Sequence, residues 1–288
     1  MPELPEVETL KTGLSSRITN KKIKNIIIFN EKSFILHKSK LENVLGSVIR
    51  QVNRRGKLLI IELSNDYNLL VHLKMTGQLV FVGKNRFGAG HPNDSLLSKL
   101  PDTSTRVEFI FDDNTKLYFN DQRKFGWIKL VNNNDLVEVK FLQKLGPEPL
   151  EKEFTFELFK QRLLKHPKSN IKAVLLNQEV IAGIGNIYAD ESLWGAKIHP
   201  STKVIDISSV KLKNLYKEII YILNLSIEKG GSSNRNYVNA DGKKGSFTEF
   251  ARVFRREKLN CPRCSTIIQK IRVAGRGTHI CPKCQKLS

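Results

Sequence analysis

The feature that most restricts what this chain can fold into is a double pair of cysteines near its end. Cys261-Pro-Arg-Cys264 is followed, after sixteen intervening residues, by Cys281-Pro-Lys-Cys284. This spacing suits four thiolates that bind one zinc ion in a tetrahedral site on two hairpin turns. Four thiolates leave no open position for a substrate, so we predict a single structural Zn²⁺. A ribbon of this size holds too little apolar surface to fold without its metal.

The charge of the chain indicates a polyanionic partner. Its 288 residues include 48 Lys and Arg against 28 Asp and Glu, a formal net charge of +20. Residues 251–288 alone carry ten basic side chains and one acid, Glu257. Such an excess points to nucleic acid or to a membrane surface. No apolar run reaches membrane-spanning length and the first residues lack a secretory signal, so we expect no membrane association. The pairing of the cysteines indicates metal binding and not a disulfide framework, which suits a reducing cytoplasm.

The first half of the chain has the pattern of one helix followed by many strands. Residues 5–19 are predicted to form a helix, because Val7, Leu10, Leu14 and Ile18 fall on one face. Eight short β-type runs follow within about 110 residues, which predicts two packed sheets. The polar segment 83–102 is expected to be a surface loop. The predicted strands are 23–29, 48–54, 58–63, 69–73, 78–82, 107–111, 116–119 and 127–131.

The second half has a helical pattern. Helices are predicted at 156–164, 171–177, 187–194 and 207–228, the last with Val210, Leu215, Ile219, Leu223 and Ile227 on one stripe. Gly230 and Gly231 are expected to end it, before a polar, mobile loop at 232–247. The fold class is therefore α+β. The expected domains are 1–133 (helix and β-sandwich), 134–150 (linker), 151–250 (helical domain) and 251–288 (zinc ribbon).

The opening residues Met1-Pro-Glu-Leu-Pro-Glu-Val-Glu8 form a candidate catalytic stretch. Removal of Met1 would leave Pro2 with a free secondary amine, which can attack an electrophilic sugar carbon and form an iminium ion. Glu3 and Glu6 lie close enough in sequence to shuttle protons. The alternative is structural: Pro5 opens a helix, and the glutamates favour its N-terminal dipole.

Four further motifs are weaker, and each has a structural alternative. A turn at 121–126 carries Arg and Phe, which can act as a wedge in a base stack, or can be a solvated charge and a packing contact. The runs 54–57 and 72–77 contain a basic turn and a lone His, either of which could be structural. Residues 183–191 open a helix with Gly and Asn, which suits either phosphate binding or a helix cap.

Together these motifs resemble the bacterial formamidopyrimidine-DNA glycosylases, a family of bifunctional DNA-repair enzymes. Their order and spacing match over nearly the whole chain, and Leu4 favours this branch over the related endonuclease VIII branch. The resemblance implies an N-terminal helix with a β-sandwich, a helical domain with a helix–two-turn–helix element, a zinc ribbon, and DNA in a cleft between the halves. The matching segments are 2–8, 72–77, 121–126, 145–150, 182–191, 230–245 and 276–284.

The resemblance also implies roles for individual residues. Pro2 is the nucleophile after loss of Met1, Glu3 is the acid/base, and Glu6 supports the site. The base-removal and strand-cleavage steps need no cofactor. Phosphate contacts are implied for Lys57, His72, Asn186 and Arg276, of which Lys57 and Arg276 are counted with the catalytic set. The family inserts three side chains into the space that the flipped nucleotide leaves, and these are matched by Met75, Arg123 and Phe125. Lys172 matches a lysine near the lesion pocket.

The sequence departs from the family in places that affect DNA contacts. Thr103-Ser104 stands where a Lys-His pair is common, and Arg106 then remains as a candidate DNA contact. Asn177 replaces Asp, and Arg255 replaces Gly before the ribbon. We expect a monomer that acts on oxidised bases in double-stranded DNA in the bacterial cytoplasm, associated with the nucleoid. The alternatives are a glycosylase for oxidised pyrimidines, or a catalytically silent lesion-binding protein.

Overall fold

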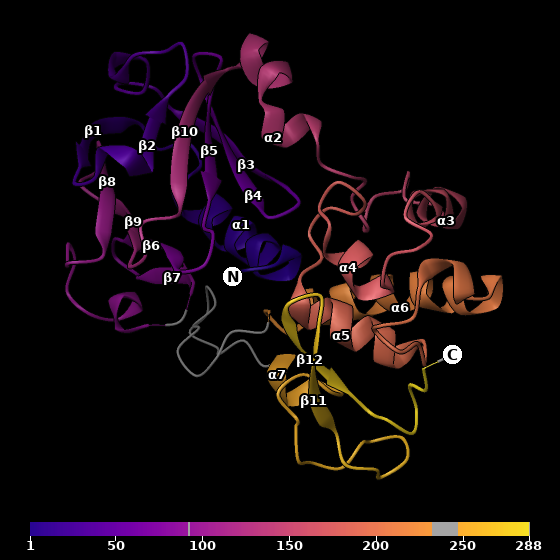
Figure 1. Cartoon of the computed structure of the whole chain (residues 1–288). Helices are drawn as coiled ribbons and strands as arrows, with labels where there is room; N and C mark the ends of the chain where they lie inside the picture. Colours follow the sequence, from indigo (N-terminus) through magenta and orange to yellow (C-terminus); the bar gives the residue numbers. More distant parts are fainter. Residues whose placement is uncertain (92, 232–246, 288) are drawn as a thin grey trace. The chain divides into compact units, whose positions relative to one another are not determined.

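The computed structural model describes residues 1–91, 93–231 and 247–287, which form two compact units (Figure 1). The first unit consists of residues 1–143 with 229–231, and the second of residues 144–228 with 247–287. The loop predicted at 232–247 lies outside the described residues, apart from Phe247. In the described residues, no helix is both long and apolar enough to span a bilayer.

The first unit contains one long helix and two sheets, as the sequence predicts. Each sheet has five strands, and two of these ten strands, Phe34–Leu36 and Phe87–Gly90, are not among the eight predicted. Helix α1 (Leu4–Ile18) buries Val7, Leu10, Leu14 and Ile18 in a core shared with both sheets. The strand orders are β1-β8-β9-β6-β7 and β2-β10-β5-β4-β3, with β2 and β10 parallel. The strands are β1 (Ile23–Ile28), β2 (Phe34–Leu36), β3 (Ile49–Arg55), β4 (Leu58–Leu63), β5 (Tyr67–His72), β6 (Gly77–Val82), β7 (Phe87–Gly90), β8 (Thr105–Phe111), β9 (Lys116–Asp121) and β10 (Trp127–Asn132).

The prediction that 83–102 is a surface loop is wrong for part of its length. It contains strand β7 and the short 3₁₀ turn η3 (Asp94–Leu96), and Phe87 is buried against helix α1. Gly13 makes this contact possible, because a Cβ there would lie 2.1 Å from the Phe87 ring. Strand β7 has few large apolar residues of its own. Its conformation therefore depends on pairing with β6 and on packing against α1, which sequence periodicity does not record.

A short helical segment covers part of the second sheet. The 3₁₀ turn η4 (Asn133–Glu138) and helix α2 (Lys140–Gln143) bring Val139 into a small cluster with Leu58, Leu70 and Val131. Residues 133–143 thus belong to the first unit and pack against its second sheet by apolar contacts.

The second unit is built from five helices and a two-stranded ribbon within its described residues. The helices are α3 (Phe156–Leu164), α4 (Ile171–Leu176), α5 (Asn186–Gly195), α6 (Ser209–Glu228) and α7 (Phe247–Phe250), with the 3₁₀ turn η5 (Val204–Asp206) between α5 and α6. The ribbon pairs β11 (Gln269–Val273) with β12 (Arg276–Ile280). Helix α5 is buried over most of its length, and Tyr188 Oη lies 2.5 Å from Ser226 Oγ of α6.

One residue of the stripe predicted on the last long helix is misplaced. Val210 is 72% exposed, whereas Leu212, Leu215, Ile219 and Leu223 are buried. The helix starts at Ser209, so Val210 lies in its first turn and faces solvent. The predicted stop is confirmed, because Gly230 and Gly231 follow the helix with φ of +74° and +86°.

Candidate functional site

The start of helix α1 organises the proposed nucleophile. Glu3 is the residue before the helix, and its backbone N–H donates a 2.8 Å hydrogen bond to the Glu6 carboxylate. Pro2, Glu3 and Glu6 are all buried. The structural alternative is correct as a description of the helix start, since Pro5 and Glu6 lie in its first turn. The same arrangement holds the Pro2–Glu3 peptide in a defined position, so the two interpretations are compatible.

The backbone passes close to Glu6 after helix α6. A Cβ on Gly231 would lie 3.3 Å from Glu6 Oε1, and the φ of Gly231 is +86°. Glycine tolerates both the close approach and the left-handed conformation. The Glu6 carboxylate therefore lies close to the backbone of both Glu3 and Gly231, which are far apart in the chain.

His72 lies at the end of strand β5, beside Lys57. Its ring packs 5.7 Å from Trp127 and 5.3 Å from Phe141, measured between centroids, and Nδ1 accepts the backbone N–H of Lys74 at 3.0 Å. Burial lowers the pKa of His72 to about 3, with a further contribution from the positive charges of Lys74 and Lys57. The ring is therefore neutral at physiological pH, with its proton on Nε2. As a DNA contact, it would act as a neutral hydrogen-bond donor.

The predicted wedge residues stand on two turns that Asp121 links together. Asp121 is fully buried and accepts hydrogen bonds from the Thr76 hydroxyl and from the backbone N–H of Gly126, the latter at 2.6 Å. Met75 and Phe125 are 39% and 55% exposed, which is unusual for apolar side chains of this size. The Arg123 guanidinium lies 4.8 Å from the Phe125 ring.

Sequence reasoning missed the role of Asp121, although it lies in a motif singled out for Arg123 and Phe125. A carboxylate directly before a turn that contains glycine is typical of an Asx-type turn, so a local signal was present. The carboxylate also reaches Thr76, which is 45 residues away, and only the pairing of β6 with β9 brings the two together. The effect is that Met75 and Arg123 share one rigid support.

Arg106 supports the same turn from inside the sheet. It is 8% exposed, and its Nε donates a 2.7 Å hydrogen bond to the carbonyl of Asp121. A direct DNA contact by Arg106 stays a prediction. Close by, Ser104 is buried and donates hydrogen bonds to Asp102, so the Thr103-Ser104 segment is held by its own local network.

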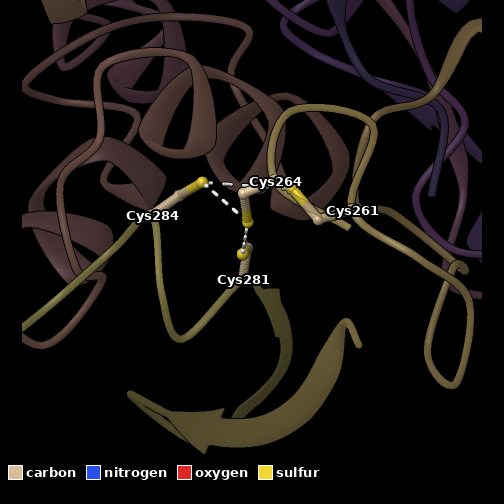
Figure 2. A group of neighbouring side chains, drawn as sticks. All are labelled: Cys261, Cys264, Cys281 and Cys284. Atoms are coloured by element: carbon tan, nitrogen blue, oxygen red, sulfur yellow. Dashed lines mark hydrogen bonds between the residues drawn. The ribbon is translucent and has the colours of Figure 1, made fainter. Parts of the chain in front are cut away.

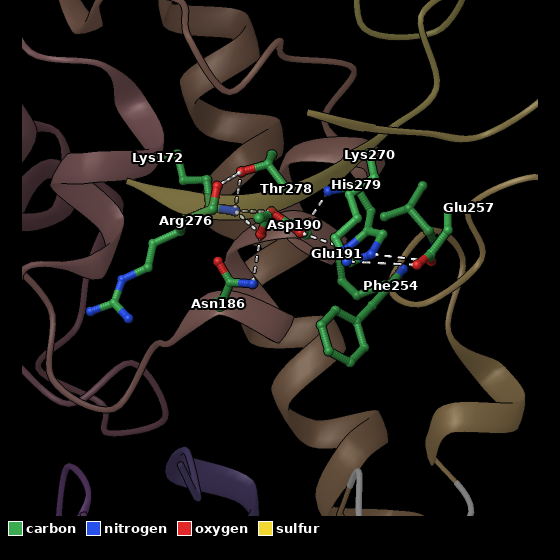
Figure 3. A network of polar contacts seen from close by, with 12 residues as sticks. Lys172, Asn186, Asp190, Glu191, Phe254, Glu257, Lys270, Arg276, Thr278 and His279 are labelled. Atoms are coloured by element: carbon green, nitrogen blue, oxygen red, sulfur yellow. Dashed lines mark hydrogen bonds and ion pairs between the residues drawn. The ribbon is translucent and has the colours of Figure 1, made fainter. Parts of the chain in front are cut away.

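In the second unit, a buried ion pair ties the ribbon to the helices (Figure 3). Lys172 Nζ lies 2.5 Å from Asp190 Oδ1 and donates a 2.6 Å hydrogen bond to Thr278 Oγ1, and both ionic side chains are fully buried. The other Asp190 oxygen accepts the backbone N–H of His279 at 2.9 Å. A position of Lys172 near the lesion pocket stays a prediction; its contacts in the structure hold α4, α5 and β12 together.

Asn186 and Arg276, predicted to contact phosphate, lie on either side of this network. Asn186 is the first residue of α5, and its side-chain amide donates a 3.0 Å hydrogen bond to the carbonyl of Gly277. Arg276 is exposed at the start of β12, and Figure 3 shows its guanidinium pointing away from the network. The side chain of Asn186 thus contacts the residue that follows Arg276 in the ribbon hairpin.

Glu191 is a second buried carboxylate to which the sequence assigned no role. It accepts backbone N–H groups from Arg252, Val253 and Phe254 at 2.8–3.1 Å. Arg252 also pairs with Glu218 at 2.9 Å. These bonds fix the segment that leads into the zinc ribbon. No local signal distinguishes Glu191 from an ordinary helix glutamate, because its partners are more than sixty residues away.

The four cysteines gather at one point, as Figure 2 shows. Their sulfur atoms all lie within 4.8 Å of one another, with Cys264 Sγ 3.4 Å from Cys281 Sγ and 3.5 Å from Cys284 Sγ. Thiolates at about 2.3 Å from a tetrahedral zinc ion are about 3.8 Å apart. The donor set and its spacing therefore fit one structural Zn²⁺, and the prediction of the metal and its four ligands is confirmed.

The zinc site rests on the end of helix α5. Trp194 forms a small core with Cys261, Cys281, Val253 and Ile268. The guanidinium of Arg263 stacks 3.8 Å above the Trp194 ring and donates to the Trp194 carbonyl. The metal and this tryptophan together fix the orientation of a strongly basic ribbon.

Comparison with known proteins gives three family matches that together cover most of the chain. The formamidopyrimidine-DNA glycosylase N-terminal domain matches residues 1–128, the H2TH domain of the same family matches residues 145–237, and a zinc finger found in FPG and IleRS matches residues 259–287.

Full-length relatives and solved structures agree with these matches. The chain is 42% identical to the formamidopyrimidine-DNA glycosylase of Ligilactobacillus salivarius over 99% of both proteins, and 40% identical to that of Enterococcus faecalis over 100% of this chain and 98% of the relative. It is similar to the wild-type Lactococcus lactis Fpg in complex with an N7-benzyl-Fapy-dG containing DNA (TM-score 0.85, 35% identity, 99% of this chain and 100% of that one). The MutM (FPG) protein of Thermus thermophilus matches over 100% of both chains (TM-score 0.84, 34% identity).

Proposed function

The chain belongs to the formamidopyrimidine-DNA glycosylase family, and from this premise we propose how its own residues repair DNA. It is a base-excision repair glycosylase that removes oxidised purines, and a lyase that cleaves the abasic strand. The observation that carries the residue assignment is the hydrogen bond from the Glu3 backbone to Glu6, which fixes the Pro2–Glu3 peptide at the head of a buried helix.

Pro2 is the nucleophile once Met1 has been removed. With Met1 attached, its nitrogen is a tertiary amide whose lone pair is delocalised. The free nitrogen forms a bond to the sugar C1′ as the glycosidic bond breaks, and the base leaves with a proton. Glu3 supplies the proton that the leaving base or the opening sugar ring requires. Attack leaves a proton on the Pro2 nitrogen; its transfer through Glu3 to O4′ breaks the C1′–O4′ bond, opens the sugar ring and gives an iminium ion between Pro2 and C1′.

Strand cleavage follows from the iminium ion. Its positive charge acidifies the C2′ hydrogen, and loss of that proton expels the 3′ phosphate by β-elimination. A second proton loss then expels the 5′ phosphate by δ-elimination. Glu3, after giving up its proton, is the group best placed to accept one. Glu6 holds the Glu3 backbone throughout.

The remaining predicted residues bind the DNA and keep the nucleotide out of the stack. Extrusion costs a few kcal/mol, and inserted side chains offset that cost. The exposed Met75, Arg123 and Phe125 are suited to fill the vacated space, since Asp121 and Thr76 hold their turns. Phosphate contacts are assigned to Lys57 and His72 of the first unit and to Asn186 and Arg276 of the second.

Borohydride trapping tests the chemistry. A duplex with 8-oxoguanine opposite cytosine should give a reduced covalent adduct at Pro2 of the Met1-processed protein, located by peptide mass spectrometry. Glu3→Gln is the matched variant: it should slow release of the base far more than cleavage of a preformed abasic site, because an abasic site needs no base protonation. An adduct at another residue, or equal losses on both substrates, would contradict the assignment.

The same assay separates the alternatives. Faster cutting of a thymine glycol duplex than of the 8-oxoguanine duplex would favour an oxidised-pyrimidine enzyme, and tight binding without cutting would indicate a silent lesion-binding protein. A monomeric state and action in the bacterial cytoplasm belong to the proposal as well. Light scattering on the DNA-free protein tests the first of these, and fluorescence localisation tests the second.

A further inference from the structure

A hollow of about 460 Å³ lies beside the ribbon hairpin in the second unit. Its walls include Asn186, Phe254, Arg255, Glu257, Lys270 and His279. Figure 3 shows Asn186 on a helix, Lys270 and His279 on the ribbon, and Phe254 and Glu257 on one neighbouring segment, all close to the network that carries Arg276. Asn186 is the only residue named here to which a role is assigned above; Phe254, Arg255, Glu257, Lys270 and His279 have none.

Arg255 is held in the wall of this hollow in a costly conformation. Its φ is +58°, in the left-handed region that glycine adopts readily and that other L-residues rarely occupy. The side chain is exposed, and its guanidinium lies 5.5 Å from the Phe254 ring. Among the described residues it forms no ion pair with a carboxylate. Position 255 thus carries a cation with no carboxylate partner among the described residues, although a glycine would adopt this backbone conformation with less strain.

The other charges of the hollow largely balance one another. Lys270 Nζ lies 3.7 Å from one Glu257 oxygen, and His279 Nε2 lies 3.3 Å from the other. Arg255 is therefore the charge in excess. The hollow also adjoins Asn186 at the start of the ten-residue helix α5, where the helix dipole favours an anion.

We propose that this hollow binds one backbone phosphate of the DNA, with Arg255 as its principal cation and Lys270 as a second. The inference rests on the proposed function and adds a phosphate to those assigned to Asn186 and Arg276. Guanidinium groups match phosphate oxygens in pairs, and the Phe254 ring holds the Arg255 guanidinium at the hollow. The benefit of this contact offsets the cost of a non-glycine residue at position 255.

The chain offers a matched pair of variants to test this. Arg255→Gly removes one positive charge from a residue with positive φ in the wall of the hollow. Lys258→Gly removes one from an exposed residue with φ of +71° that does not line it. Both changes relieve backbone strain, so neither should unfold the ribbon. Arg255→Asn provides a second test, because asparagine also tolerates this conformation.

The measurement is the salt dependence of binding by the full, zinc-loaded chain to a duplex with an uncleavable tetrahydrofuran abasic analogue. Each phosphate neutralised contributes about 0.9 to the slope of log K against log salt. Arg255→Gly and Arg255→Asn should each lower the slope by about 0.9. The ratio of the binding constant of the unmodified protein to that of either Arg255 variant should therefore fall about 3.5-fold as the salt concentration rises from about 50 to about 200 mM. Lys258→Gly should keep the original slope.

Equal slopes in all four proteins would overturn the proposal, and so would an equal loss in Lys258→Gly, which would indicate a diffuse basic surface. Failure of the proposed function would be recognised by a different experiment. The binding measurement requires no catalysis and tests the phosphate site alone, whereas absence of the borohydride adduct would contradict only the assignment of Pro2 as the nucleophile. Zinc content and thermal unfolding of each variant confirm that the ribbon is intact.

Discussion

His72 should make the first unit lose stability as the pH falls, and His72→Asn should remove that loss. The pKa of His72 in the folded protein is about 3, because burial disfavours the charged ring, whereas an unfolded histidine titrates near 6.5. Between these two values the unfolded chain therefore binds a proton at His72 and the folded chain does not. The contribution of the neutral His72 to the unfolding free energy is fully present above about pH 6.5 and is lost progressively as the pH falls towards 3.

The size of the effect follows from linkage. Each pKa unit corresponds to about 1.4 kcal/mol, so His72 alone should cost about 2 kcal/mol of unfolding free energy between about pH 7.5 and about pH 5. Asparagine keeps an acceptor for the Lys74 backbone N–H but does not titrate. It also loses the contacts with Trp127 and Phe141, so His72→Asn should be less stable at neutral pH.

Urea unfolding at several pH values measures this, with tryptophan fluorescence as the signal. The chain has two tryptophans, Trp127 in the first unit and Trp194 in the second, so Trp194→Phe leaves a reporter for the first unit alone. In that background the difference in unfolding free energy between the parent protein and its His72→Asn variant should narrow by about 2 kcal/mol as the pH falls from about 7.5 to about 5. A difference that does not change with pH would refute a buried neutral His72.

Three further substitutions probe the packing and the turn at 121–126. Lys172→Met should cost about 3–5 kcal/mol, because it leaves the buried Asp190 carboxylate without its cation, and an added Asp190→Asn should recover part of the loss in thermal unfolding. Phe125→Ala should change the unfolding free energy by less than about 0.5 kcal/mol, since the ring is 55% exposed, yet slow single-turnover excision; unchanged excision would count against insertion. Gly13→Ala should destabilise by about 1–3 kcal/mol through its clash with Phe87, and an unchanged melting temperature would contradict that contact.

Much of the architecture could be predicted because it is recorded in short-range patterns. The zinc ligands follow from two Cys-x-x-Cys pairs, and helix α1 follows from the 3.6-residue period of Val7, Leu10 and Leu14. The resemblance to the family added the order of the domains. Strand β7 and the exposure of Val210 escaped prediction, because one depends on a neighbouring strand and the other on where the helix begins.

The sequence by itself determined the metal and the class of fold, since each depends on residues close together in the chain. Only the tertiary structure decided which charges are buried and paired. Lys172, Asp190 and Thr278 are separated by up to 106 residues, and their contact exists only once α4, α5 and β12 have packed. The neutral state of His72 and the unneutralised charge of Arg255 have the same origin. The free energy of a charged group depends on its burial and on neighbours that are distant in the sequence, and the spacing of nearby residues predicts neither of these.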